Sequence, residues 1–134
     1  VLAFLMPIVA SMGGNAGMQT LAVTVRTIAT NDLTQNNFSS NVFKEFSIGI
    51  LNGIIFAAIS AFVVQIWFQD SILSIIIAIS MILTMIIAGL FGILVPFTLK
   101  KMHIDPAIAS SVFVTTITDV IGFVSFLGVG AYFL

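Results

Sequence analysis

Four long apolar stretches constrain what this chain can fold into more than any other feature. They cover residues 1–29, 46–68, 71–99 and 107–134, and polar or charged segments separate them. Each stretch has at least the roughly 20 residues that a helix needs to cross ~30 Å of hydrocarbon. Only 7% of the 134 residues are charged, against about 25% in a soluble domain. A soluble surface is therefore disfavoured, and we expect the chain to lie in a lipid bilayer.

The bilayer also dictates the class of fold. In lipid, each backbone N–H and C=O must be satisfied within a helix or a closed barrel. The apolar stretches lack the alternation of barrel strands and far exceed their length of about ten residues. We therefore predict an all-α fold, a polytopic transmembrane helix bundle with four spans, formed as one domain over residues 1–134.

Basic residues predict how the bundle is oriented. Arg26 and Lys44 flank the loop 30–45, and a Lys pair at 100–101 opens the loop 100–106. Basic loops stay cytoplasmic, so both loops should lie inside and both chain ends outside a cell membrane. An outside amino end without a start signal predicts at least one preceding span, and hence that the chain is a fragment of a longer protein.

Small residues and a proline predict details of the helices. Gly49, Gly53 and Ala57 recur every four residues, a spacing that lets two helices approach closely. Pro106 is expected to open the last helix, because its missing N–H is not needed at that position.

Asp119 is the main candidate for a functional residue. It lies near the centre of the last apolar stretch, where a carboxylate costs about 2.5–3.5 kcal/mol to insert. At helical spacing it shares a face with Ser111, Thr115, Thr118 and Gly122, which predicts a wet, hydroxyl-rich wall. The alternative is an Asp that is protonated or hydrogen-bonded and only holds helices together.

The first apolar stretch is interrupted at its middle by Gly13, Gly14 and Gly17, together with Asn15 and Gln19. Each of these glycines costs a helix about 1 kcal/mol relative to Ala. One interpretation is a loosened segment that lines a cavity and turns its carbonyls toward an ion. The other is a small-residue packing face, with the two amides hydrogen-bonding between helices. The sequence leaves both open.

The available ligands favour a hard cation. The chain has no Cys and a single His, His103, so the site has only carboxylate, hydroxyl, amide and carbonyl oxygens. Such oxygens suit Mg²⁺, Ca²⁺, Na⁺ or Mn²⁺. Mg²⁺ gives up water reluctantly, so one acid per chain in a wide pore would hold it partly or fully hydrated. Two Asp119 carboxylates in a homodimer would neutralise its charge, and four spans are few for a complete pore.

Other classes of function find little support. Intramembrane proteolysis needs a Ser with a helix-borne His or two membrane Asp residues, whereas Asp119 is the sole acid at mid-span. We therefore predict that the chain is not an enzyme. Nucleic-acid binding would require clustered basic residues, and the largest cluster is the Lys pair at 100–101.

The sequence resembles the MgtE family of magnesium channels and transporters over nearly its whole length. Four motifs, in the family's order, carry the resemblance: Gly13-Gly14-Asn15-x-Gly17-x-Gln19 within the stretch from Pro7 to Arg26, Lys44-Glu45, Gly92-x-x-x-Pro96 followed by Asp105-Pro106-Ala107, and Thr115-Thr116-x-Thr118-Asp119-x-x-Gly122. The chain departs from the family at Ser111 and Val112, where Gly or Asn followed by Pro is frequent.

The resemblance implies a dimer of five-helix subunits, of which this chain lacks the first helix. It also implies cytoplasmic sensor domains that close the pore when Mg²⁺ is plentiful. The pore would run between subunits, with Asp119 at the ion site and Thr115 and Ser111 as further ligands. The residues implied to line the pore are Gly13, Gly14, Asn15, Gln19, Thr118 and Gly122.

The expected function is therefore Mg²⁺ transport through a dimeric pore in the membrane. Two alternatives remain at this stage. One is a coupled transporter for another divalent cation or Na⁺, which would use the same site with a different driving force. The other is a membrane scaffold that conducts nothing, in which the polar residues only join helices.

Overall fold

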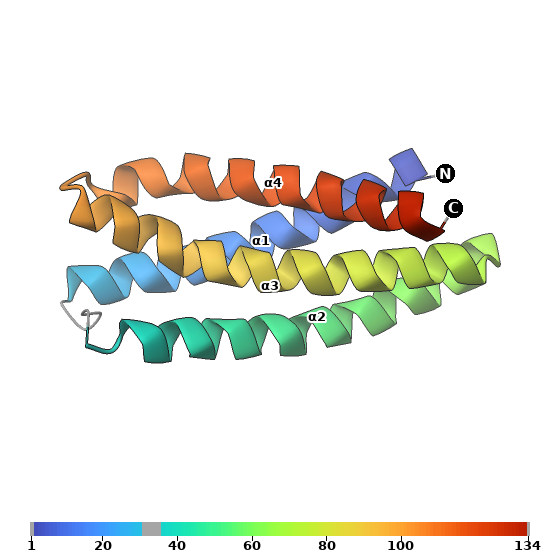
Figure 1. Cartoon of the computed structure of the whole chain (residues 1–134), viewed down its shortest axis with the longest axis horizontal. Helices are drawn as coiled ribbons and strands as arrows, with labels where there is room; N and C mark the ends of the chain where they lie inside the picture. The colour runs from blue at the N-terminus through green and yellow to red at the C-terminus, as the bar shows by residue number, and fades with distance from the viewer. Residues whose placement is uncertain (1, 31–35, 134) are drawn as a thin grey trace.

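The computed structural model describes residues 2–30 and 36–133, and they form a bundle of long helices (Figure 1). The helices are α1 (Leu2–Ala29), α2 (Phe38–Phe68), α3 (Ser71–Lys101) and α4 (Pro106–Phe133). No strand occurs within these described residues. The all-α prediction is confirmed, as is the start of the last helix at Pro106.

Three of the four helices are both long and apolar enough to cross a membrane. They are α2, α3 and residues 110–133 of α4. The prediction of four apolar spans is thus confirmed for three. At 28 residues α1 has the required length, but the amides and glycines at its centre lower its mean hydropathy.

The first connection is shorter than the sequence predicted. α2 begins at Phe38, before the apolar stretch expected to start at residue 46, so the second half of the predicted loop 30–45 is helical. Polar residues tolerate a helix there because a helix can extend beyond the hydrocarbon into the headgroup region. Residues 31–35 of that loop lie outside the described part of the chain.

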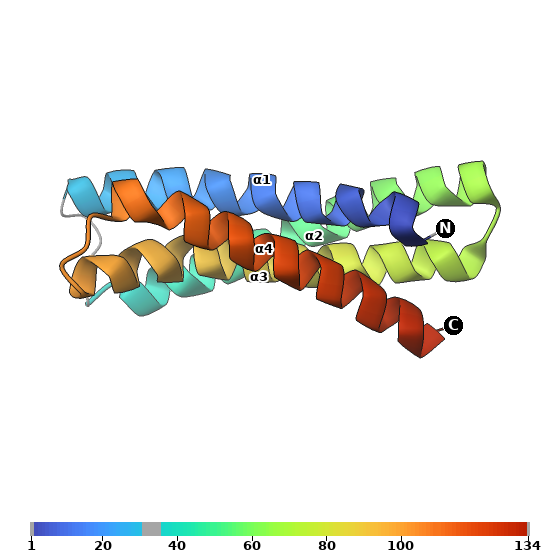
Figure 2. The same ribbon diagram turned by 90° about the horizontal axis from the view of Figure 1, so that it is seen from above.

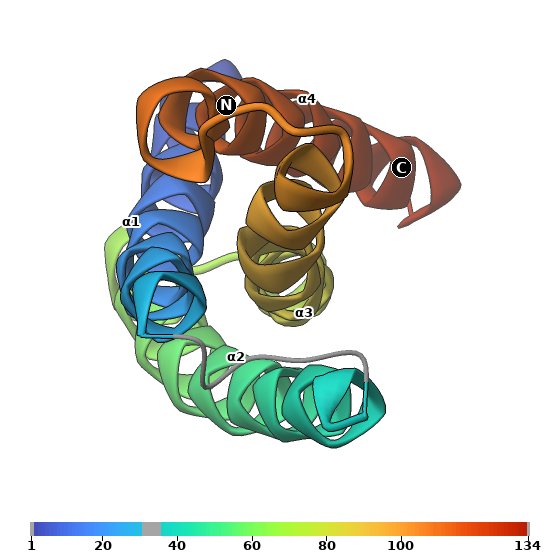
Figure 3. The same ribbon diagram turned by 90° about the vertical axis from the view of Figure 1, so that its left-hand side faces the viewer.

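α3 is the central helix of the bundle. Viewed along the bundle, it lies inside an arc formed by α4, α1 and α2 (Figure 3). It contacts each of the other three helices, whereas α1 and α2 barely touch. The fully buried side chains gather around it and include Val9, Ile76, Ile77, Met81 and Phe126.

Glycines bring α2 directly against the backbone of α3. A Cβ on Gly49 would lie 2.9 Å from the Cα of Ile86, and one on Gly53 would lie 3.0 Å from the Cα of Ile82. Ala57, one turn further on, is also buried. The close helix approach predicted from this spacing is confirmed.

Local interactions fix both ends of the α2–α3 pair. At the short turn, Gln69 adopts a left-handed conformation with φ of 51°. The Asp70 carboxylate then accepts hydrogen bonds from the backbone N–H groups of Ile72 at 3.0 Å and Leu73 at 3.2 Å, which caps α3. At the opposite end, the rings of Phe38 and Phe97 stack with centroids 4.1 Å apart.

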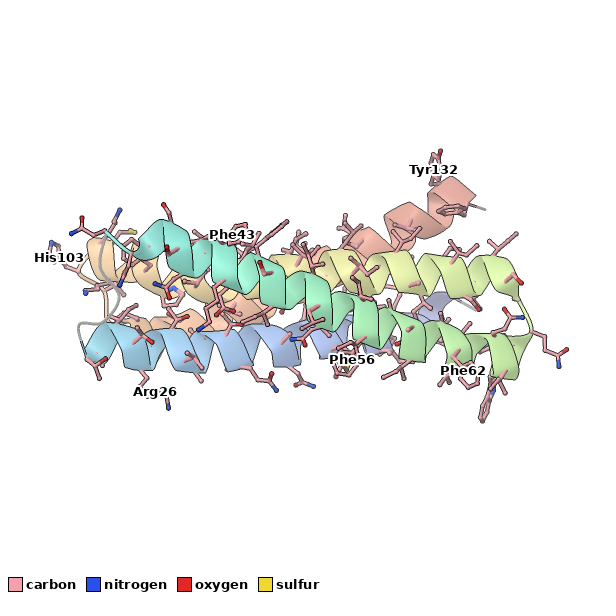
Figure 4. The ribbon with its side chains drawn as sticks, turned by 90° about the horizontal axis from the view of Figure 1, so that it is seen from below. Arg26, Phe43, Phe56, Phe62, His103 and Tyr132 are labelled. Atoms are coloured by element: carbon pink, nitrogen blue, oxygen red, sulfur yellow. The ribbon has the colours of Figure 1, made fainter. Side chains whose placement is uncertain are left out.

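α4 runs obliquely to the rest of the bundle. Its first half lies beside α1, and its carboxyl end diverges from the other helices (Figure 2). Tyr132 stands on this diverging end, while Arg26 and His103 both lie toward the other end of the molecule, on different edges of the bundle (Figure 4). The basic residues flanking the two predicted cytoplasmic loops are therefore found at one end of the bundle.

Candidate ion site

The seam between α1 and α4 is built from small residues. A Cβ on Gly122 of α4 would lie 3.1 Å from the Cα of Ala10. Further along the antiparallel pair, a Cβ on Gly17 would lie 2.9 Å from Val114 and 3.2 Å from Thr118. Glycine suits these points because the helices approach so closely that an added side chain would force its neighbours to shift.

The glycine segment of α1 is an unbroken helix. Gly13 is buried, and a Cβ added to it would collide with the methyl group of Thr84 on α3. Thr20 packs in the same way against Gly92 of α3, where an added Cβ would lie 2.6 Å from the Cβ of Thr20. Of the two interpretations left open by the sequence, the structure shows the packing face of the glycines in an unbroken helix, but among the described residues Asn15 and Gln19 make no hydrogen bond between helices.

Asp119 lies at the middle of α4 and is half-buried. Its neighbour Thr118 places this level of α4 opposite Gly14, since a Cβ on that glycine would lie 3.9 Å from the Thr118 hydroxyl. Within the described residues the Asp119 carboxylate has neither a hydrogen-bond donor nor an ion-pair partner. A group that is costly at this depth is thus left available for a ligand.

The predicted hydroxyl stripe on α4 divides into two parts. Thr118 and Gly122 are buried in the bundle, and the Thr118 hydroxyl donates to the backbone carbonyl of Thr115 at 3.0 Å. Thr115 itself is exposed, with its hydroxyl 3.8 Å from the sulfur of Met18, and Ser111 is half-buried. The side chains accessible together with Asp119 are therefore Thr115 and Ser111, the two residues implied as further ligands.

The residues of α1 implied to line a pore also differ in exposure. Asn15 and Gln19 are exposed, Gly14 is half-buried and Gly13 is fully enclosed. Asn15, like Asp119, is at the midpoint of its helix. An exposed amide at that depth would face lipid in an isolated chain, and it would lack hydrogen-bond partners there.

The described residues include no group of three or more His, Cys, Asp and Glu side chains that could hold a metal. His103 is exposed in the α3–α4 loop with φ of 61°, as expected for a solvated loop residue. The chemistry at mid-membrane is therefore that of one carboxylate with neutral oxygens. This donor set suits a hard cation that keeps part of its water shell.

Sequence analysis missed one polar cluster. Glu45 of α2 shares a cavity with Thr20 of α1 and with Asn52, which lies seven residues further along α2. The signal was present, because residues spaced by seven lie on one face of a helix. Glu45 was considered only as part of the Lys44-Glu45 motif.

Comparison with known proteins gives a consistent result. Residues 6–129 match the family model MgtE, described as a divalent cation transporter. The chain is 35% identical over 133 residues to a magnesium transporter MgtE of Bacillus subtilis, and 31% identical over 134 residues to one of Enterococcus faecalis. It is 32% identical over 133 residues to one of Thermus thermophilus. These matches cover 99–100% of this chain but only 29–30% of the relatives.

Proposed function

Because the chain belongs to the MgtE family of divalent cation transporters, we propose that it forms the membrane pathway for Mg²⁺ in a longer transport protein. Members of this family are transporters and not enzymes. The relatives named magnesium transporters support Mg²⁺ as the cargo. The chain spans less than a third of their length, so cytoplasmic sensor domains and a further membrane helix belong to this proposal.

The ion site is proposed at Asp119. The observation that carries the proposal is a carboxylate at the middle of α4 that is accessible and has no donor or cation among the described residues. Leaving it charged and unpaired would cost about 2.5–3.5 kcal/mol, or more on an isolated helix. A passing cation and its water would offset that cost.

Mg²⁺ would be held through its hydration shell. Water molecules bound to the ion would donate hydrogen bonds to the Asp119 carboxylate, with the Thr115 and Ser111 hydroxyls as further acceptors. Selection by ordered water suits Mg²⁺, which gives up its water more reluctantly than Ca²⁺. The carboxylate thus supplies charge, and the hydroxyls position the shell.

A second copy of the chain is proposed to complete the pore. One chain presents the Asn15 amide and the half-buried Asp119 carboxylate at mid-membrane depth, where lipid cannot satisfy them. Facing copies would enclose these groups in a wet path, and two Asp119 carboxylates would balance the charge of one Mg²⁺. In this arrangement the 30–45 and 100–106 loops are cytoplasmic and both chain ends lie outside.

The experiment is Mg²⁺ uptake into liposomes containing the protein in its full-length setting, native or with Asp119→Asn. We expect uptake to fall at least about tenfold, because one carboxylate interaction of ~1.4 kcal/mol already corresponds to that factor. Asp70→Asn is the matched control. It removes one carboxylate outside the site, and Asn is as good a helix cap as Asp.

Retained uptake in Asp119→Asn, at equal incorporation and with an intact dimer, would refute the ion site. Native protein that takes up no more Mg²⁺ than empty liposomes, with assembly altered in Asp119→Asn, would favour the scaffold interpretation. Uptake that requires a Na⁺ or proton gradient would identify a coupled transporter that uses the same residue.

A further inference from the structure

A second polar site lies on the opposite side of α1 from the seam with α4. It is a partly open cavity of about 170 Å³ lined by residues of α1, α2 and α3. A single water molecule needs only about 10–15 Å³ of such space. Figure 4 shows the start of α2 separated from α1, with the two helices drawing together further along. The cavity lies where they are apart.

Polar side chains from two helices line this cavity. α1 contributes Gln19 and Thr20, and α2 contributes Glu45 and Asn52. Gly89 on α3 forms part of the floor, and a Cβ there would lie 3.2 Å from the backbone carbonyl oxygen of Glu45. Glycine therefore lets α3 approach α2 without filling the space in front of the carboxylate.

The Glu45 carboxylate is poorly compensated. Its described partner is the Thr20 hydroxyl, which donates to it over a long 3.3 Å. No described Lys, Arg or His forms an ion pair with it, and the side-chain amides of Gln19 and Asn52 have no described hydrogen-bond partners. The half-buried acid and two amide groups thus meet in one cavity with their hydrogen-bonding capacity almost unused.

The depth of Glu45 allows a hydrated ion to reach it. α2 has 31 residues, which span about 46 Å, whereas the hydrocarbon layer is ~30 Å thick. Glu45 is seven residues inside the start of the helix, or about 10 Å along it. A centred helix places this residue near the boundary between headgroups and hydrocarbon, where water is available.

We propose that Glu45, Thr20, Asn52 and Gln19 form a second cation site, for a hard divalent ion that keeps most of its water. One carboxylate with neutral oxygens and room for water is a typical environment for Mg²⁺, which uses few protein ligands. The carboxylate supplies the charge, and the two amide oxygens accept hydrogen bonds from the ion's water. The site does not require Asp119 to bind an ion.

The test uses Mn²⁺ as the probe and counts the ions bound to the full-length protein in nanodiscs by electron paramagnetic resonance. Asp119→Asn serves as the background, so that the pore site does not contribute. Adding Glu45→Gln should remove one bound Mn²⁺ per chain, and Asp70→Asn in the same background should remove none. Excess Mg²⁺ should displace this Mn²⁺, and equal ionic strength of Na⁺ should not.

A second variant tests the site independently in case the Glu45→Gln protein does not fold. Asn52→Leu keeps the carboxylate and should weaken Mn²⁺ binding at this site about tenfold, as the loss of groups that orient ligand water usually does. Equal Mn²⁺ stoichiometry and affinity in all variants would overturn the proposal. Displacement by Na⁺ but not by Mg²⁺ would also overturn it. In either case the Asp119→Asn uptake experiment would still stand on its own.

Discussion

The two sides of α1 are built in opposite ways. Toward α4 and α3, Gly13 and Gly17 bring helices so close that no side chain fits between them. Toward α2, the helix barely makes contact, and a cavity lined by Glu45 separates the two. Small residues give rigid helix contacts by dispersion and close packing, because lipid provides no hydrophobic force that would join apolar helices. The charged Glu45 lies where that packing is absent.

The two faces of α1 therefore have different roles: one positions α4, and the other carries side chains that can bind an ion. The tight seam holds α4 in place and so sets the position of Asp119, but its own glycines are enclosed and contribute no ligand side chain. The accessible polar groups lie beside the seam or across the helix from it. We expect substitutions on the tight side to affect stability most, and those on the cavity side to affect ion binding.

Two neighbouring residues of α1 provide the strongest test of this comparison. Gly17→Leu places a side chain against Val114 and Thr118 and should destabilise the bundle by about 1–3 kcal/mol through overpacking. Ala16→Leu directs the same side chain to the helix face that lines the cavity, and it should cost less. Thermal unfolding in detergent measures both. Equal losses would show that the cavity side is as tightly constrained as the seam.

Replacing glycine with alanine should change stability less, and in opposite directions at Gly49 and Gly128. Gly49→Ala would press a methyl group on the backbone of Ile86, at a net cost of about 1 kcal/mol after the gain in helix propensity. Gly128 has nothing within 4 Å of an added Cβ, so Gly128→Ala should stabilise its helix slightly. The two variants make the same chemical change, and the sign of the shift in unfolding temperature distinguishes them. A matching shift in both would argue against a close α2–α3 contact.

The smallest predicted change concerns two buried hydroxyls beside the glycine seam. Thr84 is 1% exposed and its hydroxyl has no hydrogen-bond partner among the described residues, whereas the Thr118 hydroxyl donates to the Thr115 carbonyl. Replacing an unsatisfied buried hydroxyl with a methyl group removes a penalty. Thr84→Val should therefore hold or raise stability by up to about 1 kcal/mol, while Thr118→Val should lower it by about 0.5 kcal/mol. Loss of stability in Thr84→Val would show that its hydroxyl has a partner in the assembled protein.

Much of the fold could be predicted from the sequence. Long apolar runs must be helical in lipid, and the spacing of Gly49, Gly53 and Ala57 indicated the face that packs on α3. The start of α2 was predicted too late, because hydropathy marks where the chain enters the lipid and the helix begins at Phe38, before that point. Hydropathy also gave no indication that Gly13 and Gly17 of α1 pack against other helices while Asn15 and Gln19 remain exposed.

The candidate site could be predicted only in part. Asp119 stood out because a charge in an apolar run is costly, and the structure confirms that it lies at the middle of an unbroken helix. That Thr118 turns inward while Thr115 remains exposed could not be predicted from spacing. Helical periodicity defines which residues share a face, but the oblique crossing of α4 decides how much of that face the neighbouring helices cover (Figure 2).

By itself, the sequence determined that this chain is a bundle of membrane helices with a single acid at mid-depth, because the solvent leaves the backbone no other choice. Only the tertiary structure decided that the glycines of α1 form a packing seam and that Glu45, Thr20 and Asn52 meet in one cavity. Thr20 comes from α1, whereas Glu45 and Asn52 come from α2. Their meeting depends on crossing angles and on close side-chain packing, which no local pattern along the chain encodes.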